Sequence, residues 1–154
     1  MIEYYANVAE IVGVILVVIT LAFLTLEIRH NTRALRATTI QAVMQSEMAL
    51  SSFLAKHADT WEKVLTGAPI DAGAEMRKAI IIFNVFMIDT ENRYHQSLAG
   101  YLDSGSWESR LGLLPEMVQL PIFAEWRRSP GGRSHAADFL ALIDRVTMQT
   151  EKST

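Results

Sequence analysis

Hydrophobic residues are spread very unevenly along this chain, and the densest run lies near its N-terminus. Residues 11–26 read IVGVILVVITLAFLTL, an apolar run broken only by one glycine and two threonines. Extended from Val8 to Ile28, it covers roughly 30 Å of helix at ~1.5 Å per residue, which matches the hydrocarbon thickness of a bilayer. Glu10 and Glu27 are its only charged residues, and each lies near an end. The pattern predicts one transmembrane helix.

The charges that flank this run predict its orientation. Arg29, Arg33 and Arg36 follow the run, whereas no Lys or Arg precedes it. By the positive-inside rule, we expect residues 29–154 in the cytoplasm of a bacterial cell and the N-terminus outside the cytoplasmic (inner) membrane. A cleavable signal peptide would carry its positive charge before the apolar run. A buried core helix remains the alternative interpretation.

Most polar and small residues of the apolar run lie on one seam at heptad spacing. The members of this seam are Glu10, Gly13, Val17, Thr20, Leu24 and Glu27. Polar groups are costly when they face lipid, so the seam is expected to face helices of other copies of the chain. The sequence therefore predicts a homo-oligomer. In the alternative, Thr20 and Thr25 bond to their own backbone carbonyls and both glutamates lie among lipid headgroups.

The remaining chain reads as helical throughout. No glycine or proline occurs between Gly13 and Gly67, so one helix can run through the membrane and beyond it, with a kink at Asn31 left open. Further helices are expected over about 72–99 with Asp71 as cap, from Ser106 to about 114, over 121–128, and from Ser134 after a Ser-Pro-Gly-Gly loop. No segment alternates with the period of a strand. We expect an all-α fold: residues 1–28 as tail and transmembrane helix, and residues 29–154 as a cytosolic helical bundle.

Apolar residues at helical spacing predict the core of this bundle. The expected inward-facing residues are Val43, Leu50, Leu54, His57, Trp61, Val64 or Leu65, then Met76, Ile80, Phe83, Met87, Tyr94 and Leu98, and finally Phe139, Leu142, Ile143 and Val146. The apolar run at residues 79–88 is too short to cross a membrane, so it is expected to be a core helix.

Composition changes this picture little. The chain carries 14 Lys and Arg against 17 Asp and Glu, a net charge of −3, which argues against a nucleic-acid-binding surface. The basic cluster Arg29, Arg33 and Arg36 is better explained by orientation and anionic headgroups. The chain has no cysteine, which excludes a cysteine nucleophile, and it has no glycine-rich phosphate loop.

One pair of polar residues in the expected bundle, Glu91 and His95, has the residue types of a metal or proton-transfer site. Glu91 and His95 are four residues apart, so they lie on one helix face and could share a metal ion or a proton. A single such pair supplies only two ligands, so we expect a polar seam formed by Glu91, Asn92, His95 and Gln96 instead. We predict no metal, no cofactor and no catalytic activity.

Two stretches resemble a family of small, uncharacterised bacterial single-pass membrane proteins. The stretches are Leu26-Glu-Ile-Arg-His-Asn-Thr-Arg-Ala-Leu35, directly behind the apolar run, and Glu91-Asn-Arg-Tyr-His-Gln96, followed by Gly100, Trp107 and the region of Trp126. Members of that family more often carry Gln where this chain has Glu27. The resemblance implies an N-terminal span joined to a helical cytosolic domain, and it implies no activity.

Three functions are compatible with these patterns. The first is a membrane-anchored assembly module that binds itself or a partner. The second is an oligomeric cation pore lined by Glu10, Thr20 and Glu27. The third is an accessory subunit whose span binds a larger membrane complex. The lipid bilayer and further copies of the chain are the expected partners, and we favour the module.

Overall fold

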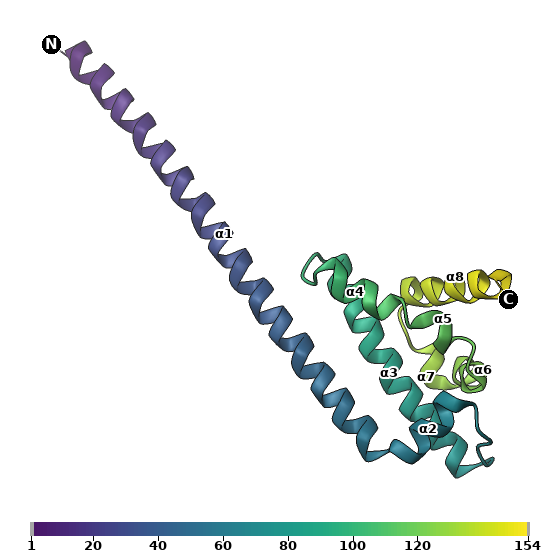
Figure 1. Ribbon diagram of the computed structural model, residues 1–154. Coiled ribbons are helices and arrows are strands. Elements are labelled where there is room, and N and C mark those ends of the chain that lie inside the picture. Colours follow the sequence, from purple (N-terminus) through teal and green to yellow (C-terminus); the bar gives the residue numbers. More distant parts are fainter. Residues whose placement is uncertain (1, 154) are drawn as a thin grey trace. The chain divides into compact units, whose positions relative to one another are not determined.

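The computed structural model assigns backbone structure to residues 2–153 and describes the side chains of residues 12–152. Its helices are α1 (Ile2–Lys56), α2 (Ala58–Thr66), α3 (Ala74–Leu98), α4 (Ser104–Leu111), α5 (Leu114–Met117), α6 (Pro121–Arg128), α7 (Pro130–Arg133) and α8 (Ala137–Ser153), as Figure 1 shows. The described part of the chain contains no strand, which confirms the all-α prediction. Its contacts divide the chain into two units, residues 1–38 and 39–154.

The long helix α1 differs from the expected one at its end. It is continuous through Asn31, where the hydroxyl of Thr32 donates a hydrogen bond to the Ile28 carbonyl at 2.9 Å. However, α1 stops at Lys56, so the prediction of one helix up to Gly67 is wrong. His57 leaves the helical conformation at φ −122° and ψ 29°, and α2 begins directly behind it. The break lets α2 pack on α3. The sequence does not predict it, because neither glycine nor proline occurs at this position.

We call the second unit, residues 39–154, the compact unit. Helix α3 lies at its centre, where it contacts α2, α4, α6 and α7 (Figure 1). Its N-cap is Gly73 rather than the expected Asp71. Instead, the Glu75 carboxylate accepts a hydrogen bond from the Asp71 amide at 2.9 Å and another from Lys63 of α2 at 2.7 Å. The bond from Lys63 lowers the pKa of Glu75, so the pair connects α2 to the start of α3.

The core is built mainly from large side chains of α3, α6 and α8. Trp126, Phe83, Phe139, Met87 and Ile143 are fully buried, and the Phe83 and Trp126 rings meet edge to face with centroids 5.6 Å apart. Each such burial stabilises the fold by about 1.5–3 kcal/mol. Most of the predicted core residues are buried or packed against this cluster. One prediction is wrong, because Leu98 is 64% exposed. Of the alternatives Val64 and Leu65, Val64 is the buried residue, at 1% exposed.

Three helix starts near the C-terminal half also differ from expectation. Helix α4 begins earlier than predicted, because Asp103 rather than Ser106 is its N-cap and accepts from the Ser106 amide at 3.0 Å. The expected loop after Ser129 contains the one-turn helix α7, which Ser129 caps. Ser134 does not cap α8, because its hydroxyl donates to the Gly131 carbonyl.

Gly132 marks the tightest turn of this region. It is buried in α7, and a Cβ atom at this position would collide with the backbone carbonyl of Trp126. Backbone atoms cannot swing aside as the end of a side chain can. The close passage of α7 over α6 therefore requires glycine here.

We expect Gly132→Ala to destabilise the full chain by about 1–3 kcal/mol, the usual range for overpacking. Unfolding by urea in detergent, followed by tryptophan fluorescence, measures the effect. Gly112→Ala is the control, because a Cβ there would meet its nearest neighbour, the Glu108 carbonyl oxygen, at 3.4 Å, close to ordinary van der Waals contact. Equal stability of the two variants would contradict the tight turn.

Candidate functional site

The apolar part of α1 carries its side chains on an open surface. Every residue from Val12 to Ile28 is exposed, and the large apolar side chains in this range are 49–67% exposed. A helix that is apolar all round lies either in a protein core or in a membrane. One helix of the described residues, this one, is long and apolar enough to cross a membrane.

The predicted seam lies in this helix. Gly13, Val17, Thr20, Leu24 and Glu27 are all exposed, whereas the side chain of Glu10 lies outside the described residues. Thr20 and Thr25 both donate from their hydroxyls to the carbonyl four residues earlier, at 2.8 Å. This is the arrangement of the alternative interpretation, and it satisfies the hydroxyl protons within the helix. The oxygen lone pairs of both threonines remain available to a neighbouring helix.

The basic cluster Arg29, Arg33 and Arg36 continues along the same helix. All three side chains are exposed, as is His30 between them. Spacings of four and three residues place the arginines on one side of a helix, where they can contact anionic headgroups together.

The four residues of the predicted polar seam divide among separate partners. Glu91 binds the loop before α8, whereas His95 lies 3.4 Å from the Asp138 carboxylate and is exposed. Asn92 is exposed and accepts from the Gln96 amide at 3.1 Å. Glu91 and His95 therefore serve different contacts, and no group of three His, Cys, Asp or Glu side chains in the described part could hold a metal ion.

Glu91 belongs to a buried network that sequence reasoning missed. One Glu91 carboxylate oxygen lies 2.6 Å from His135 Nδ1, and the other accepts from the Ala136 amide at 2.6 Å. His135 Nε2 faces the side-chain oxygen of Asn84 at 3.2 Å, and the same oxygen accepts from the Trp126 indole at 2.9 Å. The network joins α3 to α6 and to the start of α8. Its members engage one another, so it holds these elements together.

A second buried cluster is centred on Asp89 of α3. Its side chain is 6% exposed and accepts three hydrogen bonds: from Ser46 of α1 at 2.9 Å, from Arg93 at 2.9 Å and from Arg110 of α4 at 2.6 Å. The Arg110 guanidinium also lies over the Phe86 ring, 4.9 Å from its centroid. Three helices therefore meet at one carboxylate. The spacing of Asp89 and Arg93 was the only sequence signal for it.

The two arginines differ in how they are neutralised. Burial lowers the pKa of Arg110, and the Asp89 carboxylate counteracts that effect. Arg93 shares Asp89 and also forms an ion pair with Glu47, whose carboxylate lies 3.1 Å from Arg93 Nη2. That nitrogen is buried and makes no hydrogen bond to the described residues, because the ion pair is poorly aligned. Glu47 is 57% exposed, so this pair contributes little compared with Asp89.

A cavity of about 500 Å³ opens beside this cluster and is lined by Glu47, Arg93, Asp103, Ser106 and Arg110, among others. With Asp89 included, three carboxylates face two guanidinium groups, so an anion would gain no net attraction there. Asp103 also engages Ser106, whose hydroxyl donates to it at 2.6 Å. The cavity is thus charge-compensated from within and is a poor anion site.

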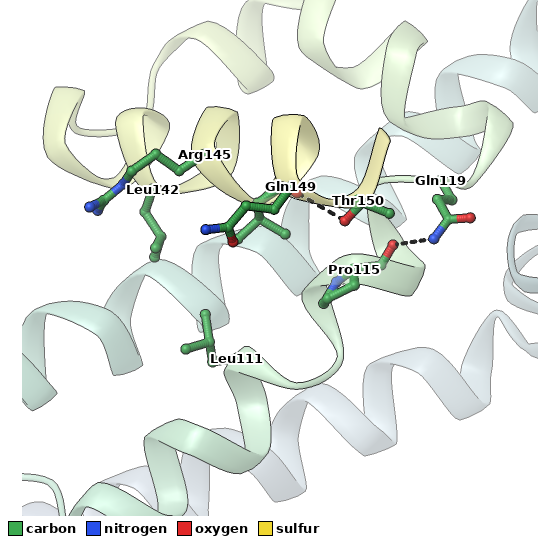
Figure 2. Close-up of a pocket in the computed structure, with 8 residues that line it drawn as sticks. Leu111, Pro115, Gln119, Leu142, Arg145, Gln149 and Thr150 are labelled. Atoms are coloured by element: carbon green, nitrogen blue, oxygen red, sulfur yellow. Dashed lines mark hydrogen bonds between the residues drawn. The ribbon is translucent and has the colours of Figure 1, made fainter. Parts of the chain in front are cut away.

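A further cavity, of about 610 Å³, lies between α8 and the segment from Leu111 to Gln119. Figure 2 shows Leu142 of α8 and Leu111 on opposite sides of it, with Arg145 and Gln149 along its edge. Gln119 donates to the Pro115 carbonyl at 3.0 Å, which fixes one wall. Arg145 is the only titratable residue in the lining, so this cavity lacks the pairs of groups that acid–base chemistry requires.

Comparisons with protein-family models, with curated proteins and with solved structures gave no significant match.

We expect Asp89→Ala to destabilise the chain by about 3–5 kcal/mol, because it leaves two buried guanidinium groups without their shared carboxylate. Glu47→Ala is the matched control: it removes the exposed partner of the same Arg93 and should cost less than about 1 kcal/mol. Urea unfolding of both full-length variants in detergent compares them. A loss for Asp89→Ala no larger than that for Glu47→Ala would show that Asp89 does not organise the cluster.

Proposed function

We propose that this chain is a single-pass protein of the bacterial cytoplasmic membrane. The single observation that carries the proposal is the apolar surface of α1 from Val12 to Ile28, which is exposed on every side. Left in water, large apolar side chains on every face of a helix would forfeit their transfer free energy, whereas lipid surrounds them at no such cost. The arginine cluster behind this surface supports a cytoplasmic location for the compact unit.

We further propose that the chain acts by assembly with copies of itself and has no catalytic activity. The seam from Gly13 to Glu27 supports self-association, because it collects most of the small and polar positions on one side of the apolar helix. The buried polar clusters support a non-catalytic role, because Asp89 and Glu91 are engaged by arginines, a histidine and a backbone amide.

The first test is the mass of the particle in detergent or nanodiscs. We expect a homomeric particle that contains two or more 17.2 kDa chains and conducts no ions in liposomes. A particle with one chain would refute self-association, and co-purification of that single chain with a different membrane protein would favour the accessory subunit. Cation flux that Glu27→Gln abolishes would favour the pore.

A matched pair of threonines tests the seam itself. Thr20 lies on the seam and Thr25 does not, yet both hydroxyls make the same bond to their own backbone at 2.8 Å. We expect Thr20→Leu to weaken self-association about threefold to tenfold, the usual range for a polar contact between membrane helices, and Thr25→Leu to leave it unchanged. Förster transfer between labelled copies in liposomes measures both. Equal effects would remove the seam as the interface.

A further inference from the structure

A shallow apolar groove runs between α1 and α3 within the compact unit. It has a volume of about 380 Å³, and its lining includes Ser46, Ala49 and Phe53 of α1 and Val85 and Ile88 of α3. The two helices face each other here, because Ser46 of α1 donates a hydrogen bond to Asp89 of α3 at 2.9 Å. The groove therefore lies between neighbouring stretches of the two helices.

Helix α3 exposes a stripe of branched aliphatic residues, of which Val85 and Ile88 line the groove. Ile81 is 60% exposed and Ile88 is 51% exposed, and the half-buried Val85 lies between them. The spacing of four and three residues makes these side chains one stripe of the helix. Such a stripe matches the knobs that pack between helices in a bundle. The α1 side offers Ser46 and Ala49, which are small enough to form holes.

Charge is almost absent from this surface. Asp89 is the one charged residue that lines the groove, and its carboxylate is bound to Ser46, Arg93 and Arg110. Between Ala37 and Ala55, α1 carries a single charged residue, Glu47, which is paired with Arg93. Two identical copies of this surface can approach each other without opposing like charges, which would otherwise cost several kcal/mol.

We propose that the groove is the cytosolic contact between two copies of this chain. The α1–α3 pair of one copy packs on the same pair of the second copy, which gives an isologous four-helix bundle about a two-fold axis. This inference rests on the proposed function, because it assigns a further surface to the same self-association.

Membrane anchoring explains why a second copy is the occupant. Single spans inserted with the same orientation are parallel, so equivalent surfaces of two copies meet at the same height. Association in the membrane also raises the effective concentration of the cytosolic surfaces.

Single-cysteine cross-linking tests the groove directly, since the natural chain has no cysteine. The full-length chain with Ile88→Cys is oxidised in membranes, beside Met148→Cys as control. Met148 of α8 is 53% exposed, close to the 51% of Ile88, and lies outside the groove. We expect covalent dimer to form at least five times faster with Ile88→Cys. Equal rates would overturn the inference.

The outcome separates this inference from the proposed function. A wild-type particle with several chains, combined with equal cross-linking rates, would leave the seam in place and exclude the groove. A wild-type particle with one chain would refute both. Protection of the Ile88→Cys thiol from a soluble maleimide without any covalent dimer would assign the groove to lipid or to another protein, and this result also overturns the inference.

Both cysteine variants should keep the wild-type fold, because each replaces a half-exposed side chain. Ile88→Glu and Met148→Glu add a second measurement under the same logic. We expect the glutamate at Ile88 to weaken self-association at least tenfold, because two like charges would face each other across the axis, and the glutamate at Met148 to have no effect. Equal self-association of the two glutamate variants would count against the groove.

Discussion

Neutralisation of two buried arginines by one carboxylate is the constraint on which the compact unit depends. Asp89 accepts hydrogen bonds from Arg93, Arg110 and Ser46, so α1, α3 and α4 meet at this carboxylate. Replacing such a cluster by apolar groups is often neutral or even stabilising, whereas removing one member leaves a buried charge. The cluster therefore fixes which helices pack together and in which register, more than it adds net stability.

How much of this could be predicted depends on how far apart the interacting residues are in sequence. The all-α fold and most of the core follow from apolar residues at helical spacing, which is a local signal. Asp89 and Arg93 are also local, four residues apart. Arg110 and Ser46 come from other helices, and His135 lies 44 residues from Glu91 in the sequence. Those pairings depend on how the helices pack, so the sequence predicts a polar seam on α3 but not its partners.

The break at His57 is a second feature that the local sequence does not predict. Neither glycine nor proline occurs there, so helix propensity favours one continuous helix to Gly67. The chain nevertheless turns, and α2 reaches α3, where Val64 is fully buried and Lys63 binds Glu75. Burial of an apolar residue together with a new ion pair offsets the lost helical hydrogen bonds. Tertiary packing thus overrides a local preference, which no local pattern could reveal.

Helix α3 presents two faces with opposite chemistry, and this contrast bears on function. One face carries Asp89 and Arg93, buried and mutually satisfied, while Ile81 and Ile88 stand half-exposed on another. Burying a charged side chain costs more free energy than burying an isoleucine, yet in this unit charged side chains are buried and these isoleucines are exposed. An exposed aliphatic stripe beside a nearly uncharged stretch of α1 is the composition of a helix–helix interface. The exposed stripe of α3 is therefore the surface that the proposed contact between two copies would cover.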